Sequence, residues 1–299
     1  MKSKAKTAGT LFLLDPNHGY ILRCDADGKN VEILVRDRTD TPDGITLDVE
    51  RGHIYWTNMG ADPKADSGYI ERANRDGTNV ITVVPRGFTH TPKQLKFSAS
   101  DQRLYWSDRE GMRVMRANLD GTNIETLVVA GTSEEDRLNQ TKWCVGMAVD
   151  SATGWIYWTQ KGGDNAGQGR IFRAHIDIPE GQSPQNRNDI EVLYNDLPEP
   201  IDLDIDFAKS RLYWSDRGAP PTGNSVNFGA LEPSQGATRQ VLATGMHEAI
   251  GLALDRRERR LFVSDLSGCL YRMNMDGTEF QQLISGQGHL TGIVYTDTL

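Results

Sequence analysis

The chain has few of the features that mark membrane, disulfide-rich or helical proteins. Its 299 residues contain no apolar run long enough to span a bilayer, and the first ten residues do not lead into the apolar core of a signal peptide. It has only three cysteines, which cannot form an even disulfide framework. No window keeps a period of 3.6 over a dozen residues. We therefore expect a cytoplasmic protein with reduced thiols and little helix.

Positive charge and nucleotide motifs are also scarce. The 33 Lys and Arg residues face 41 Asp and Glu residues, which gives a formal net charge of −8 and argues against nucleic acid or an acidic membrane as a partner. One exception, residues 256–260, contains four arginines and fits a solvated hairpin turn better than a basic recognition patch. Neither a glycine-rich phosphate loop nor a serine nucleophile elbow is present.

What the chain does contain is a repeat. Tyr55-Trp56-Thr57-Asn58 comes back in related form, and successive copies lie 49 to 56 residues apart. The later copies begin at Tyr105, Tyr157, Tyr213 and Phe262, and a weaker copy begins at Phe12. A period of this size is typical of stacked blades or coils.

Each repeat predicts four short strands. In the first copy these are residues 44–48, 53–57, 68–73 and 80–84, rich in β-branched and aromatic side chains. Asp76-Gly77 supplies the positive φ that the last hairpin needs. A single sheet of this kind cannot bury both faces, so we predict an all-β fold in which six four-stranded antiparallel blades close into a β-propeller.

The two chain ends predict how the ring closes. Residues 292–295 have the pattern of an inner strand without partners, and residues 11–34 have the pattern of the three strands that it lacks. Pairing them in one blade removes an open sheet edge. We therefore expect one propeller domain over residues 11–299, preceded by a flexible tail of residues 1–10.

The Tyr-Trp repeat resembles the YWTD six-bladed propellers, also called low-density lipoprotein receptor class B repeats. The resemblance runs from Leu11 to Tyr295, and five of the six copies carry it clearly. The fourth copy departs from it, because its third strand lacks the recurrent arginine and residues 231–236 replace the Asp-Gly turn. No cysteine-rich modules accompany the repeats, so the resemblance implies a stand-alone soluble member. Its function stays open, because one fold hosts many functions.

Candidate functional residues are those that break the repeat symmetry, because a residue that recurs in every blade does the same structural work each time. On that ground we interpret the motif aspartates as structural. They are Asp15, Asp108, Asp216 and Asp265. Alignment of the loops that lead into the inner strands places two neighbouring columns of polar residues around the channel mouth. These columns contain His90, Trp143, Glu199, His247, Glu248 and His289.

Charged residues also enter the channel itself. The inner strands carry small or apolar residues in most blades, but they carry Gln94 and Lys96 in blade two and Asp202 and Asp204 in blade four. A charge near the axis is costly unless it is paired. Either Lys96 pairs with a carboxylate and plugs the channel, or these groups orient a polar substrate.

The leading hypothesis is a small polar ligand at the channel mouth, with lyase, hydrolase or isomerase chemistry by acid–base catalysis. The acid–base candidates are His247, Glu248, His289, Asp202 and Lys96. The ligand-binding candidates are Asp43, His90, Gln94, Arg109, Trp143, Glu199, Asp204 and Arg217. We predict no cofactor. A divalent metal held by His90, His247, His289, Glu199 and Glu248 is one open alternative, and a non-catalytic propeller that binds a protein or peptide is another.

Overall fold

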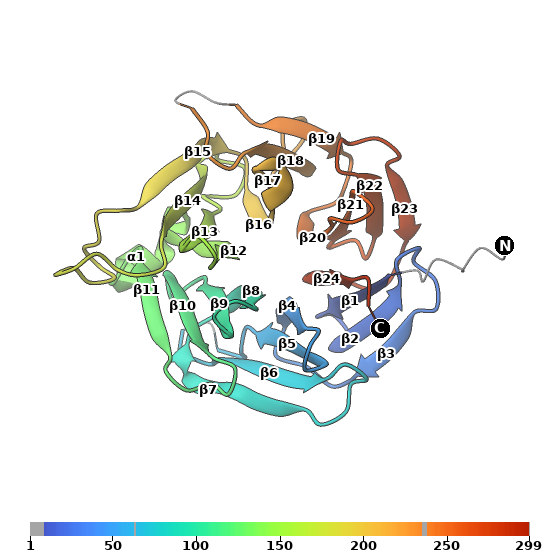
Figure 1. Ribbon diagram of the computed structural model, residues 1–299, viewed down its shortest axis with the longest axis horizontal. Coiled ribbons are helices and arrows are strands. Elements are labelled where there is room, and N and C mark those ends of the chain that lie inside the picture. Colours follow the sequence, from blue (N-terminus) through green and yellow to red (C-terminus); the bar gives the residue numbers. More distant parts are fainter. Residues whose placement is uncertain (1–8, 63, 235–237, 299) are drawn as a thin grey trace.

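Six four-stranded antiparallel sheets stand in a ring around a central channel in the computed structural model of the chain (Figure 1). The structure describes residues 9–62, 64–234 and 238–298. We number the blades by the order of their inner strands, so that blade one begins at β4 and the blade that joins the two chain ends is blade six. The six-bladed β-propeller predicted from the repeat is confirmed.

The strands of each blade run from the channel outwards in chain order. Blades one to three contain β4 (Pro42–Asp48), β5 (His53–Asn58), β6 (Gly68–Asn74), β7 (Ile81–Thr89); β8 (Pro92–Ser98), β9 (Arg103–Asp108), β10 (Arg113–Asn118), β11 (Glu125–Val129); β12 (Cys144–Asp150), β13 (Trp155–Gln160), β14 (Gly169–His175) and β15 (Glu191–Leu197). Blades four to six contain β16 (Pro200–Asp206), β17 (Arg211–Asp216), β18 (Ser225–Ala230), β19 (Gln240–Thr244); β20 (Ala249–Asp255), β21 (Arg260–Asp265), β22 (Leu270–Asn274), β23 (Gln281–Ile284); β24 (Ile293–Thr296), β1 (Thr10–Asp15), β2 (Tyr20–Asp25) and β3 (Glu32–Val35).

The ring closes where β24 pairs with β1. The two strands run antiparallel, with Thr10 opposite Thr296 and Leu13 opposite Ile293. The predicted closure is therefore confirmed, and it leaves no inner strand unpaired in the described part of the chain. Residues 1–8 of the expected tail lie outside the described residues, and β1 already begins at Thr10.

The repeated motif holds neighbouring blades together. Its aromatic residues are buried; Trp56, Trp106, Trp158 and Trp214 are among the most completely buried large side chains. Its hydroxyl residue bonds to the inner strand of the next blade: Thr57 Oγ1 donates to the Lys93 carbonyl at 2.8 Å, and Ser107 Oγ donates to the Gly146 carbonyl at 2.7 Å. The recurrence of Tyr-Trp-Thr/Ser is thus explained by packing and by this hydrogen bond, which blades one to five make to the next blade; blade six carries Leu14 at the hydroxyl position.

The motif aspartates bond to the loops that lead into the inner strands. Asp108 accepts from the backbone N–H groups of His90 and Thr91 at 2.8 to 3.0 Å, and Asp265 accepts from those of His247 and Cys269 at 2.9 and 3.0 Å. The structural interpretation of these residues is confirmed for this pair.

Close approach of the inner strands explains their small residues. A Cβ atom added to Gly44 would lie 2.3 Å from the Lys93 carbonyl oxygen, and one added to Gly146 would lie 2.1 Å from that of Ile201. Both contacts are with backbone, which cannot move aside, so glycine is required at these positions.

Two features were not predicted. The helix α1 (Glu134–Leu138) and the 3₁₀ turn η1 (Gln140–Lys142) interrupt the connection between blades two and three, and a second turn, η2 (Phe207–Lys209), follows β16. The expected irregular turn of blade four lies partly outside the described residues, at 235–237.

None of the described helices is long and apolar enough to cross a membrane. All three cysteines are buried and unpaired.

Candidate functional site

The channel is filled at the end where the blade-connecting loops lie, which we call the connecting face. One position from each inner strand, or from the loop just before it, forms this hub. The six residues are Asp43, Lys93, Val145, Ile201, Ile250 and Thr291, and all are buried. Val145, Ile201 and Ile250 form an apolar cluster. Lys93 makes an ion pair with Asp43, and Gln94 Nε2 donates to Asp43 Oδ1 at 3.3 Å. Burial lowers the pKa of Lys93, although Asp43 opposes this shift. The hub is therefore half apolar and half polar, and its polar half contains one ion pair.

A second ion pair spans the channel below the hub. Lys96 Nζ of β8 lies 3.5 Å from Asp202 Oδ1 of β16, so the pair joins blades two and four past the small Ala148 of blade three. Of the two alternatives left open for Lys96, the pairing with a carboxylate is observed. Asp202 also accepts from the N–H groups of Leu203 at 2.8 Å and Leu252 at 3.0 Å. Burial nevertheless raises the pKa of Asp202 to about 6.

Three cations stand at one repeat position on the connecting face. Arg109, Lys161 and Arg217 each follow the motif directly in blades two, three and four, and we call them the cationic arc. Arg109 and Lys161 lie 5.0 and 5.7 Å from the centre of the Trp143 ring. Both distances are within the range of a cation–π contact. The arc is thus organised around one aromatic side chain.

Acidic residues neutralise the cationic arc. The buried Glu199 accepts from Arg217 Nε at 2.9 Å, and its carboxylate lies 3.3 Å from Lys161 Nζ. Arg109 makes an ion pair of 2.6 Å with Glu110. Although burial raises the pKa of Glu110, its bonds from Arg109 and Thr91 hold that pKa below the usual value. The positive and negative charges on this surface therefore balance, and the surface does not present an excess of positive charge to an anion.

The helix α1 presents a leucine to solvent beside this array. Leu138 is 83% exposed. The helix is fixed by a capping box between Ser133 and Asp136. Arg137 Nη1 donates to the Glu110 carbonyl at 3.0 Å, and Trp143 Nε1 donates to the Arg137 carbonyl at 2.8 Å. Leu138 is thus exposed on a rigid segment.

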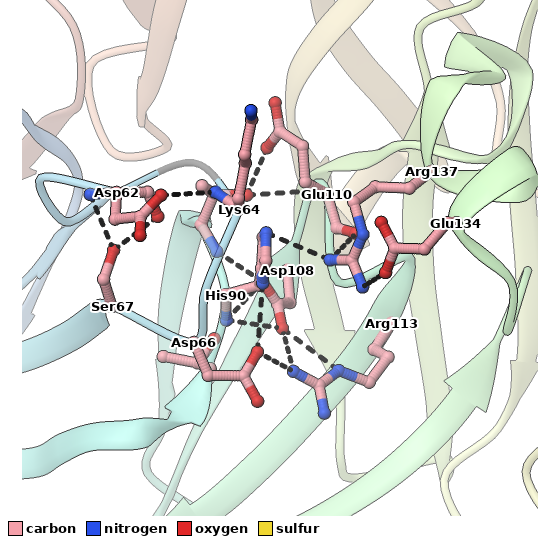
Figure 2. A network of polar contacts seen from close by, with 12 residues as sticks. Asp62, Lys64, Asp66, Ser67, His90, Asp108, Glu110, Arg113, Glu134 and Arg137 are labelled. Carbon is pink, nitrogen blue, oxygen red and sulfur yellow. Dashed lines mark hydrogen bonds and ion pairs between the residues drawn. The ribbon is translucent and has the colours of Figure 1, made fainter.

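His90 lies in a polar network behind this surface (Figure 2). Its ring is buried, with Nδ1 at 3.0 Å from Asp66 Oδ1 and Nε2 at 3.0 Å from Arg137 Nη1. Figure 2 shows Arg113 reaching the same Asp66 and the motif residue Asp108. The ring of His90 therefore connects the loop after β5 to α1.

Asp204 lies at the other end of the channel, paired with Arg256, and three further candidates lie towards solvent. His247, Glu248 and His289 are all exposed. Glu248 comes within 3.6 Å of Arg217 Nη1 at the end of the cationic arc. Within residues 9–62, 64–234 and 238–298, no three His, Cys, Asp or Glu side chains are placed to hold a metal ion, so the five candidate ligands are not assembled as a metal site.

Comparison with known proteins places the chain among its relatives. No model of a known protein family matches it. A protein of Pyricularia oryzae named low-density lipoprotein receptor-related protein 1 is 43% identical over 302 residues, covering 95% of this chain and 96% of that protein. The chain belongs to the YWTD propeller family. A second relative, a 3-hydroxyacyl-CoA dehydrogenase-like protein of Cochliobolus heterostrophus, is 36% identical over 277 residues; the match covers 89% of this chain but only 58% of that protein.

Solved structures share the propeller fold of this chain. The structure of a nidogen/laminin complex contains a chain that matches with a TM-score of 0.75 at 20% identity, covering 97% of this chain and all of that one. A gluconolactonase from Xanthomonas campestris matches with a TM-score of 0.62 at 16% identity, covering 98% of this chain and 86% of that one. At these identities the similarity shows the fold alone.

Three residues of this YWTD surface were missed from the sequence. Lys161 stands at the same position as Arg109 and Arg217, so the column of residues that follows the motif was the signal that could have found it. Lys93 likewise stands in the column of Asp43. Leu138 gave no signal, because it lies in an insertion without a counterpart in other blades.

Proposed function

We propose that this YWTD propeller is a protein-binding module, and that its connecting face binds a polypeptide through an apolar anchor that covers Leu138. The exposed leucine on a fixed helix supports this proposal. Burial of a leucine side chain is worth roughly 1.5 to 3 kcal/mol. Several hydrogen bonds fix the segment so that this side chain stays exposed to water. The free protein therefore lacks the stabilisation that burial of the leucine would give, and the complex gains it when a partner covers the side chain.

The surroundings of Leu138 suit such a partner. Trp and Arg are the residue types that dominate binding energy at protein interfaces, and Trp143 and Arg109 lie beside α1. The filled hub leaves a surface of alternating charges around them, which suits the polar rim of an interface. Exposed acids such as Glu134 and Asp164 offer charges for basic groups on the partner, while Arg217 offers one for an acid.

The test compares wild-type protein with Leu138→Asp and with a matched control, Val192→Asp. Val192 is also exposed, at 52%, but lies on the outer strand β15. Each immobilised protein is incubated with an extract of the source cells, and bound proteins are quantified by mass spectrometry. A protein that binds to the wild type and to Val192→Asp but not to Leu138→Asp is then purified. Its affinity for all three forms is measured.

We expect Leu138→Asp to weaken binding of the purified partner at least roughly tenfold, which corresponds to about 1.4 kcal/mol, and Val192→Asp to leave it within about twofold. The proposal is wrong if no recovered protein depends on Leu138, or if the control variant loses the same proteins. Acid–base chemistry on a small ligand at this face, with His247, Glu248 and His289, stays a prediction. It requires these exposed side chains to meet a ligand above the filled hub.

A further inference from the structure

The end of the channel opposite the connecting face contains a cavity of about 430 Å³. The inner strands of all six blades line it, and its volume lies within the range of small-molecule sites. The space exists because one position of the inner strand carries a small residue in several blades. This position is occupied by Thr46, Ala148 and Ala253 in blades one, three and five, and by the charged Lys96 and Asp204 in blades two and four. The cavity therefore results from the same break in symmetry that the sequence shows.

Two cations on the cavity wall have hydrogen-bond donors left over. Lys96 makes the 3.5 Å ion pair with Asp202 and, among the residues that the structure describes, no hydrogen bond. An ammonium group carries three donors. Arg256, from the hairpin after β20, uses Nε for the Ile205 carbonyl at 2.9 Å and Nη2 for Asp204 Oδ1. Its Nη1 has no partner within the described residues. These donors suit a carboxylate.

One carboxylate on the wall has an acceptor left over. Asp204 Oδ1 accepts from Arg256 and from the Ile205 N–H at 2.8 Å, whereas no described residue donates to Oδ2. With Asp202 behind Lys96, two acids balance the two bases. A ligand with net charge would upset this balance in a partly desolvated space, whereas a ligand with one charge of each sign keeps it.

Most of the remaining wall is apolar. Phe97 and Leu254 contribute to it, and Phe207, at the start of η2, lies at the opening and is 49% exposed. An aromatic ring at the mouth of a cavity is suited to cover an apolar group that enters it.

We propose that this axial cavity binds a free amino acid with an apolar side chain. The carboxylate of the amino acid lies on Lys96 and Arg256, its ammonium group lies on Asp204, and its side chain packs against Phe207. This site is separate from the connecting face and does not depend on the proposed function.

The test measures binding of phenylalanine and leucine to the full chain by calorimetry. Two analogues each lack one charge of phenylalanine: 3-phenylpropionate lacks the ammonium group and 2-phenylethylamine lacks the carboxylate. We expect the wild-type protein to bind phenylalanine at least roughly tenfold more tightly than either analogue, because each analogue leaves a charged wall group without its partner.

The variants separate the two ends of the site. Asp204→Asn removes the preference for phenylalanine over 3-phenylpropionate, and Lys96→Met lowers the preference over 2-phenylethylamine, since Arg256 alone then holds the carboxylate. Ala148→Leu fills the cavity without changing any charge and abolishes binding, which keeps the test valid if Lys96→Met folds poorly. Val192→Asp, on the outer strand β15, is the control away from the channel and leaves binding unchanged. The proposal is overturned if neither amino acid binds saturably, if both analogues bind as well as phenylalanine, or if folded Ala148→Leu binds as the wild type does.

Discussion

Replacement of Asp202 by asparagine should change how the stability of the propeller responds to pH. The carboxyl group is buried, and burial raises its pKa from 3.8 to about 6, even though Lys96 and two backbone N–H groups favour the ionised form. The folded state therefore binds this proton more tightly than the unfolded chain does. Acidification through pH 6 towards 4 then stabilises the folded state through this group, and the gain is lost as the pH rises through the folded-state pKa.

The size of the effect follows from the difference between the ordinary pKa of 3.8 and the folded-state pKa of about 6. One unit corresponds to about 1.4 kcal/mol, so the full effect is about 3 kcal/mol, and about 2 kcal/mol of it falls between roughly pH 7 and pH 4.5. Asparagine does not titrate. We therefore expect the unfolding free energy of the wild type, minus that of Asp202→Asn, to be about 2 kcal/mol larger at the lower pH.

Urea unfolding followed by tryptophan fluorescence at the two pH values measures this difference. Asp216, whose pKa burial also raises to about 6, is present in both proteins and cancels in the comparison. If the difference is the same at both pH values, or is smaller at the lower one, Asp202 does not carry the proton that we assign to it.

Further predictions concern the hub, the thiols and the cationic arc. Gly44→Ala should destabilise the fold by about 2 kcal/mol in urea unfolding because its Cβ meets backbone, whereas Gly163→Ala, with 3.3 Å to its nearest neighbour, should change it by no more than about 0.5 kcal/mol. Burial raises the pKa values of Cys24 and Cys144 to about 12, so a thiol reagent at neutral pH should react with native protein far more slowly than with denatured protein, and equal rates would contradict the buried placement. Glu199→Gln should cost about 3 kcal/mol because it leaves two cations without their shared carboxylate; an unchanged urea midpoint would show that the array contributes no stability.

The fold could be predicted from the sequence because its determinants recur. Each motif copy makes the same contacts at the same place, so the repeat fixed blade number, strand order and ring closure. Strand bounds agree closely for β5, predicted as 53–57 and observed as His53–Asn58. The outer strand β7 is longer than predicted, because residues 85–89 continue past a bulge to pair Thr89 with Gly68.

The candidate site could be predicted only where it follows the repeat. Lys96 and Asp202 stand two residues apart in the alignment, in the two inner-strand columns that face the channel, so the alignment brought them to the axis and their pairing could be foreseen. Exposure and burial of individual side chains could not be foreseen. His90 and His247 share a column, yet one is buried in a network with Arg137 and the other is exposed, because only blade two has α1 packed beside it.

The seam between β24 and β1 has a consequence for self-association. Four residue pairs join the two ends of the chain there, from Thr10 with Thr296 to Leu13 with Ile293. Nothing in this antiparallel pairing distinguishes β24 of one molecule from β24 of another. If the seam opens in a concentrated sample, two chains can exchange their last strands and close as an interlocked dimer in which each seam keeps its native strand pairing.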